Sequence, residues 1–121
     1  MTASLLRRLL AEFIGTAFLL AGVMGSGIMA ERLTDDVGLQ LLANAGATVG
    51  VLYAIILMFG PVSGAHFNPV VTLSDAALTK RSWSDVTPYI VAQIAGGAVG
   101  VMLANLMFEL DAINMSDKVR D

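Results

Sequence analysis

The segment Gly60-Pro61-Val62-Ser63-Gly64-Ala65-His66-Phe67-Asn68-Pro69 interrupts an otherwise apolar part of the chain. Glycine, proline and serine favour turns, so the segment predicts a loop that leads into a helix. Asn68 is a favoured N-cap and Pro69 a favoured first helical residue, so a short helix is expected from Pro69 to about Leu78. About ten helical residues span only about 15 Å, half of a bilayer core of about 30 Å.

Three longer apolar stretches surround this segment. They run from Leu9 to Ala30, from Leu39 to Phe59 and from Pro88 to Phe108. Each has about 21 or 22 residues, which is enough to cross a bilayer as a helix. The charged stretch from Thr79 to Asp85 follows the short helix, so the loop and half-helix, about residues 60–78, must enter and leave the membrane on one side. Such irregular backbone is tolerated only against protein or a water-filled cavity, because lipid cannot satisfy its polar groups.

The sequence therefore predicts a single domain of the all-α membrane class, with three transmembrane helices and one re-entrant half-helix. A polar tail, residues 109–121, completes the domain. Arg7 and Arg8 before the first apolar stretch leave a signal peptide as an alternative. The stretch is longer than a typical signal-peptide core and further spans follow it, so we expect a transmembrane helix.

Composition agrees with a membrane protein and excludes several function classes. The 121 residues are 56 % hydrophobic and 14 % charged, with a mean hydropathy of +0.75. The net charge of −3 and the lack of a strongly basic stretch exclude nucleic-acid binding. The sequence has no cysteine and a single histidine, and it shows no nucleophile–base pair, phosphate loop or metal cluster. We expect neither an enzyme nor a cofactor.

Three motifs resemble those of a known channel family. The stretch from Ser63 to Thr72 is similar to the first signature loop of the aquaporin and aquaglyceroporin (major intrinsic protein) family, whose usual motif is Asn-Pro-Ala. Val70 stands in place of the alanine. Ala11-Glu12-Phe13-Ile14-Gly15-Thr16 resembles the family's first helix, and Ala92-Gln93-Ile94-Ala95-Gly96-Gly97 its third. The resemblance covers nearly the whole chain but only the first of the family's two inverted repeats, and so implies a half-aquaporin.

The resemblance implies pore roles for residues of the signature loop. In the family, two half-helices meet near mid-membrane and direct their positive dipole ends and asparagine amides toward the pore. Asn68 is thus implied to hold permeating water, with an ordinary N-cap as the alternative. Pro69 and Val70 are expected to pack against an opposing half-helix. The solute path is implied to be lined by the carbonyl groups of Gly64, Ala65 and His66. The His66 side chain is expected to brace the loop or line the pore rather than to bind a metal.

Two further positions concern selectivity. Thr48 stands where the family has one member of its outer constriction, often a bulky aromatic residue. A threonine implies a wider pore suited to small neutral polyols such as glycerol, or to metalloid hydroxides; a simple helix-contact threonine is the alternative. In the family, an arginine of the filter follows the second signature motif. A pair of identical chains would carry Val71 there, so the resemblance implies a less discriminating pore.

Glu12 and Gln93 are candidate supports of the loop. A carboxylate within a membrane is costly and is a functional hypothesis by default. The resemblance implies that Glu12 accepts hydrogen bonds from the loop backbone as a structural buttress. A small proton-coupled exporter, in which Glu12 titrates during transport, is the alternative. Gln93 and Asn105 are expected to supply hydrogen bonds between helices.

Several glycine pairs have helical spacing, among them Gly46 with Gly50, Gly96 with Gly100, and Gly22 with Gly25. Small residues at this spacing let helices approach closely in lipid. We expect these pairs to lie at helix contacts.

A pore of this family needs two repeats of opposite orientation. An antiparallel homodimer would supply both, and by analogy four dimers would form an assembly of eight chains. Lysine and arginine counts bear on orientation: with a cytoplasmic N-terminus, the inner charges are Arg7, Arg8, Lys80 and Arg81, and the outer ones Arg32, Lys118 and Arg120. This weak bias is compatible with insertion in both orientations.

We therefore expect a passive pore for water or small neutral solutes in a bacterial inner membrane. A half that depends on a separate partner chain, a non-conducting subunit and a truncated longer channel remain alternatives.

Overall fold

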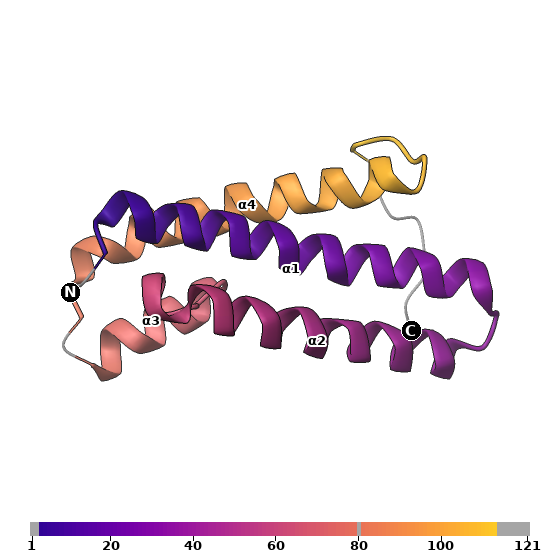
Figure 1. Ribbon diagram of the computed structural model, residues 1–121, viewed down its shortest axis with the longest axis horizontal. Coiled ribbons are helices and arrows are strands. Elements are labelled where there is room, and N and C mark those ends of the chain that lie inside the picture. The colour runs from indigo at the N-terminus through magenta and orange to yellow at the C-terminus, as the bar shows by residue number, and fades with distance from the viewer. Residues whose placement is uncertain (1–2, 80, 114–121) are drawn as a thin grey trace.

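The computed structural model describes residues 3–79 and 81–113, so Lys80, Lys118 and Arg120 lie outside the described part. Its elements are α1 (Leu5–Leu33), α2 (Val37–Ser63), α3 (Pro69–Leu78), the 3-10 turn η1 (Trp83–Asp85) and α4 (Val86–Met107). No strand occurs in the described ranges. Helix α1 lies between α2 and α4 and packs against both (Figure 1). The expected all-α class is confirmed.

In the described part of the chain, three helical segments are long and apolar enough to cross a membrane: Leu5–Leu33, Val37–Ser63 and Trp83–Met107. Side chains fix where the first two begin. Ser4 Oγ accepts a hydrogen bond from Arg7 N, and the Asp36 carboxylate accepts one from Leu39 N. Because such caps satisfy helix-end amides outside the apolar stretches, α1 and α2 begin in the polar flanking residues.

The expectation of a loop from Gly60 onward is wrong for residues 60–63. Helix α2 continues through Pro61 to Ser63. Proline lacks the N–H that a helix interior needs, but in the last turn its presence removes a single helical hydrogen bond. Gly64 then ends α2 in the left-handed conformation (φ 91°), and its N–H donates to the Gly60 carbonyl at 3.0 Å. The loop is therefore confined to residues 64–68.

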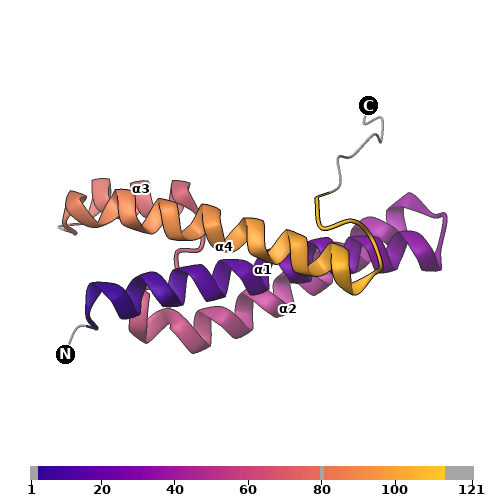
Figure 2. The same ribbon diagram turned by 90° about the horizontal axis from the view of Figure 1, so that it is seen from above.

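Helix α3 has 10 residues and so extends about 15 Å. Asn68 Oδ1 accepts a hydrogen bond from Val70 N at 2.8 Å, and Pro69 is the first helical residue. Helix α3 lies against α4, at the end of the molecule where α1 and α4 begin (Figures 1 and 2). The chain thus reaches this end along α2, turns inward through the loop and returns along α3.

Helices α1 and α4 approach each other at backbone distance. A Cβ atom added to Gly96 would lie 2.2 Å from the Phe13 carbonyl oxygen, and one added to Gly100 would lie 2.2 Å from the Ala17 oxygen. The prediction of a close helix contact at this pair is confirmed.

Two other packing expectations are wrong within this chain. A Cβ atom on Gly46 or Gly50 would meet nothing within 4 Å, because this face of α2 points away from the other described helices. Asn105 does not bridge helices; its Nδ2 donates to the Ala112 carbonyl at 3.1 Å and so closes the turn that follows α4.

Candidate functional site around the re-entrant loop

Glu12 of α1 lies at the centre of the site, completely buried against the loop. Its carboxylate accepts four hydrogen bonds, from Ser63 Oγ (2.7 Å), His66 N (3.2 Å), Phe67 N (2.8 Å) and Gln93 Nε2 (2.7 Å). Two of these donors are loop backbone amides, which lipid could not satisfy. These are the contacts that a structural buttress would make.

Side chains from α3 and α4 extend this network. Gln93 Nε2 donates to Thr72 Oγ1 at 2.9 Å as well as to Glu12. Thr72 Oγ1 lies 3.0 Å from His66 Nδ1. Gln93 therefore bridges α4 to both α1 and α3, as the expected interhelical donor. The structure brings together three of the predicted residues, Glu12, His66 and Gln93, at the loop.

The loop backbone adopts conformations that side chains usually avoid. Ala65 (φ 56°) and Phe67 (φ 54°) lie in the left-handed region, directly after Gly64. Such non-glycine residues carry strain of about 1–3 kcal/mol each. The strain is offset by hydrogen bonds to the loop amides, including the donation of Ala65 N to Ser63 Oγ at 3.1 Å.

The buried ring of Phe67 anchors the loop to α1. A Cβ atom on Gly15 would lie 2.1 Å from this ring, so only glycine leaves the space that Phe67 occupies. Phe59 contacts the ring edge-on, with centroids 6.2 Å apart. The sequence did not predict the contact between Phe67 and Gly15, although Gly15 belongs to the first-helix motif on which the family resemblance rests.

A charged layer closes the outer side of the loop. Arg81 donates hydrogen bonds to Tyr89 Oη, to the Ser63 carbonyl (3.4 Å) and to Asp75 (3.4 Å). Tyr89 also donates to the Ser63 carbonyl at 2.8 Å. Arg8 pairs with Asp85 at 2.7 Å on the same side. Sequence reasoning missed this layer, because nothing in the apolar pattern of α4 marks Tyr89 as a partner of Arg81.

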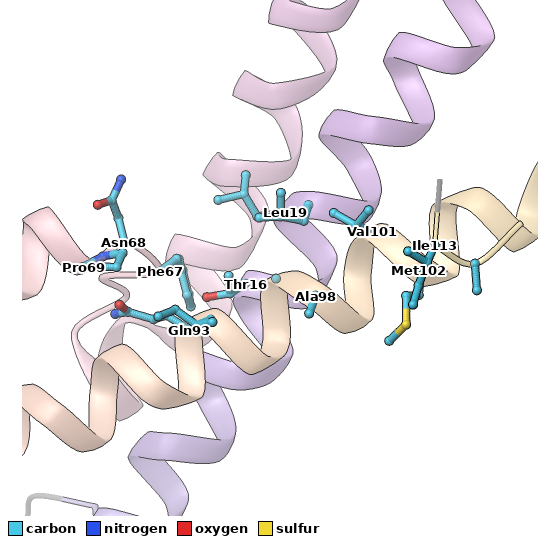
Figure 3. Close-up of a pocket in the computed structure, with 14 residues that line it drawn as sticks. Thr16, Leu19, Phe67, Asn68, Pro69, Gln93, Ala98, Val101, Met102 and Ile113 are labelled. Atoms are coloured by element: carbon cyan, nitrogen blue, oxygen red, sulfur yellow. The ribbon is translucent and has the colours of Figure 1, made fainter. Parts of the chain in front are cut away.

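A pocket of about 650 Å³ opens beside the loop, on the face formed by α1 and α4. Figure 3 shows Asn68, Pro69 and Gln93 near one end, and Met102 and Ile113 at the other. The walls are mainly apolar. Two buried polar atoms on this pocket, Thr16 Oγ1 and Gln93 Oε1, have no hydrogen-bond partner among the described residues.

The remaining predicted residues lie around this pocket rather than in it. Val70 and Val71 are exposed on α3, at 67 % and 44 %. Thr48 Oγ1 donates to the Asn44 carbonyl of its own helix at 2.8 Å. The lining includes Asn68, Pro69 and Gln93 but not Thr48, Val70, Val71, Gly64, Ala65 or His66. Within residues 3–79 and 81–113, no group of three or more His, Cys, Asp or Glu side chains could hold a metal ion.

Comparison with known proteins places the chain in a family. Residues 1–119 match the major intrinsic protein family. Over 116 residues the chain is 48 % identical to the aquaglyceroporin AqpS of Rhizobium meliloti (strain 1021), covering 96 % of this chain and 50 % of that protein. It is 36 % identical over 107 residues to aquaporin NIP6-1 of Arabidopsis thaliana, covering 88 % and 34 % of the two chains. It is also 35 % identical over 113 residues to the glycerol uptake facilitator protein-like 5 of Lactiplantibacillus plantarum, covering 85 % and 44 %.

The chain thus spans half or less of the length of each of these relatives. The family match nevertheless covers nearly all of this chain, residues 1–119. The three long apolar helices of the described residues mark an integral membrane protein. The family comprises channels rather than enzymes, in agreement with the sequence. By its match over residues 1–119 and its identity to these relatives, the chain belongs to the major intrinsic protein family.

Proposed function

We propose that two copies of the chain pair in antiparallel orientation in a bacterial inner membrane and form a passive pore for water or small neutral solutes. The observation that carries this proposal is the state of Asn68. Its Oδ1 caps α3 through Val70 N, while its Nδ2 group has no partner among the described residues and is exposed beside the pocket. A free amide donor at the positive end of a helix suits a polar, uncharged solute.

The open side of the chain supports pairing. The pocket leaves Thr16 Oγ1 and Gln93 Oε1 without partners, and unpaired polar groups are costly in an apolar environment. In a membrane, the loop must face protein or water. A second copy with its own half-helix would cover this side and keep the loop and the exposed Asn68 away from lipid. By the same family analogy, four such pairs would give eight chains.

The chemistry of the pocket favours neutral solutes. Its lining residues carry no ionised side chain, and Thr16, Asn68 and Gln93 are its polar members. Two relatives are named an aquaglyceroporin and a glycerol uptake facilitator. These names support including small polyols among the solutes, and Thr48 in place of a bulky aromatic is consistent with a pore wide enough for them, or for metalloid hydroxides.

The bonding of Glu12 supports the buttress role over proton-coupled export. A transporting carboxylate must exchange protons with water, whereas all four donors to Glu12 come from the protein and the side chain is fully buried. A passive pore should conduct equally with and without a pH gradient. Flux that requires such a gradient would support the exporter.

Substitutions at Asn68 separate its capping role from its pore role. Asn68→Leu removes both the cap and the free amide, whereas Asn68→Ser keeps a capping oxygen and replaces the amide with the hydroxyl of a shorter side chain. One lost hydrogen bond of about 1 kcal/mol corresponds to about a fivefold lower flux. We expect that loss in both variants, measured by stopped-flow light scattering of vesicles that contain the purified chain, with sucrose and glycerol as osmolytes.

The outcomes distinguish the alternatives. Wild-type flux equal to that of empty vesicles would contradict a self-sufficient pore and favour a partner-dependent or non-conducting half. Loss of flux in Asn68→Leu but not in Asn68→Ser would assign Asn68 to capping alone.

Antiparallel pairing also predicts the topology. The chain has no cysteine, so Asp35→Cys in the α1–α2 turn gives a single labelling site. Ser84→Cys, before α4, reports on the opposite end. With insertion in both orientations, we expect an impermeant thiol reagent to label about half of the chains at each site in intact cells. Full labelling of one variant and none of the other would show a single orientation and refute antiparallel pairing of this chain.

A further inference from the structure

The polar contacts around the loop form a closed circuit. Its inner half consists of Glu12, Gln93, Thr72 and His66, and its outer half of Asp75, Arg81 and Ser63. The Gln93 amide must present Nε2, not Oε1, to Glu12, because an oxygen there would face the carboxylate at 2.7 Å. Nε2 carries two hydrogens, and both are used: one for Glu12 and one for Thr72 Oγ1 at 2.9 Å. Thr72 therefore accepts from Gln93 and must direct its own proton elsewhere.

The proton of Thr72 has one side-chain acceptor in reach. Apart from Gln93, the hydroxyl contacts only His66 Nδ1, at 3.0 Å. If Thr72 donates to Nδ1, that nitrogen carries no hydrogen, and the ring hydrogen lies on Nε2. Nε2 faces the Asp75 carboxylate at 3.5 Å, where an N–H is attracted and a lone pair is repelled. Both neighbours of the ring therefore select the same tautomer.

In the outer half of the circuit, each contact likewise pairs a donor with an acceptor. Asp75 also accepts from Arg81 (3.4 Å), and Arg81 donates to the Ser63 carbonyl (3.4 Å). Ser63 Oγ in turn donates to Glu12 at 2.7 Å. Donors thus run from Gln93 and Arg81 to the two carboxylates. Only the neutral ring protonated at Nε2 gives the Thr72 hydrogen an acceptor while also directing an N–H at Asp75.

The charged surroundings agree with a neutral ring. Burial lowers the pKa of His66 from the ordinary value of 6.5, and Arg81 lowers it further, whereas Glu12 and Asp75 act in the opposite direction. These groups belong to α1, α3 and the connector that follows α3. From α4, Tyr89 faces the ring at a centroid distance of 5.4 Å. The lowered pKa keeps the imidazole uncharged at neutral pH.

We propose that Gln93, acting through Thr72, is a positioning residue that holds His66 as the neutral imidazole protonated at Nε2. The His66 backbone N–H is bound to Glu12 at the same time, so both ends of this residue are fixed and its carbonyl has one orientation. The role of this carbonyl in lining a solute path rests on the function proposed above. The tautomer of His66 does not depend on that function.

The single histidine allows a direct test. We expect solid-state NMR of the full chain, labelled with ¹⁵N-histidine in lipid bilayers at pH 7, to show a protonated Nε2 and an unprotonated Nδ1. Thr72→Val, which removes the donor to Nδ1, should abolish the single tautomer and introduce a form protonated at Nδ1. Thr72→Ser should restore the wild-type spectrum. Gln93→Leu should also give mixed tautomers, since no donor then orients the Thr72 hydroxyl so that its hydrogen points to Nδ1.

Thr48→Val is the matched control, because Thr48 bonds only to its own helix and should leave the histidine spectrum unchanged. A wild-type spectrum with Nδ1 protonated would overturn the proposal even if no variant folds. Spectra of folded Thr72→Val and Gln93→Leu that match the wild type would overturn it as well. Osmotic flux measured on the same samples separates the tautomer proposal from the proposed pore. A chain that shows the Nε2–H ring but does not conduct would support the tautomer and refute the pore.

Discussion

Replacing Glu12 with glutamine is expected to lower the free energy of unfolding by about 1–3 kcal/mol or more, because a buried donor left without an acceptor costs about 1–3 kcal/mol. Whichever carboxylate oxygen becomes an NH2 group, one loop amide then faces a donor. If Oε2 is replaced, His66 N and Ser63 Oγ lose their acceptor. If Oε1 is replaced, Phe67 N and Gln93 Nε2 lose theirs. Since Ala65 and Phe67 are held in the left-handed region, we expect the loop to relax first.

The measurement is an SDS titration in detergent micelles, followed by circular dichroism and by the fluorescence of Trp83, the single tryptophan. Glu109→Gln is the matched control, since it makes the same chemical change at an exposed position beyond α4 and should leave the midpoint nearly unchanged. Equal midpoints for Glu12→Gln and the wild type would show that Glu12 does not support the loop. They would favour the exporter alternative.

Replacing Gly96 or Gly100 with alanine should be similarly damaging, at about 1–3 kcal/mol or more, because overpacking a tight contact forces backbone to move. The added methyl group would lie 2.2 Å from a carbonyl oxygen of α1 in either case. Backbone atoms cannot rotate away as a flexible side chain can, so α1 and α4 must separate. That separation also disturbs Glu12 and Gln93, whose hydrogen bond joins these two helices.

Gly46→Ala and Gly50→Ala make the matched pair, with the same change in α2 where nothing lies within 4 Å. There alanine should be neutral or stabilising by up to about 1 kcal/mol through helix propensity. The comparison uses the same SDS titration. Similar midpoints for the α4 and α2 variants would contradict the close α1–α4 contact. A Gly46→Ala chain that unfolds normally but loses osmotic flux would instead place this open face of α2 against a second copy.

Local sequence signals accounted for the elements of the fold. The lengths of the apolar stretches predicted three spanning helices, and Asn68 followed by Pro69 predicted the start of α3. Glu12 stood out because a carboxylate is costly within an apolar stretch. The misplaced loop start has an equally local cause. Gly60 and Pro61 are typical of a turn, yet α2 continues to Ser63 and lacks only the hydrogen bond that the Pro61 nitrogen cannot donate.

Contacts between residues far apart in the sequence could not be predicted from such local signals. Gly96 and Gly46 have the same spacing to their paired glycines, but only the packing of α1 against α4 makes the first pair a contact and leaves the second open. Arg81, Asp75 and Tyr89 gave no local signal because their roles arise where the loop, α3 and α4 meet.

The sequence by itself thus determined the membrane class, the half-helix and the family resemblance, because hydropathy, capping and motifs act over a few neighbouring residues. Only the tertiary structure decided which donors meet Glu12, which tautomer of His66 the circuit selects and which glycines touch another helix. Many of those contacts join residues far apart in the sequence, such as Glu12 with Ser63, 51 positions away, and with Gln93, 81 positions away. Hydrogen bonds also depend on tenths of an ångström and on direction. Such geometry exists only once the helices have packed.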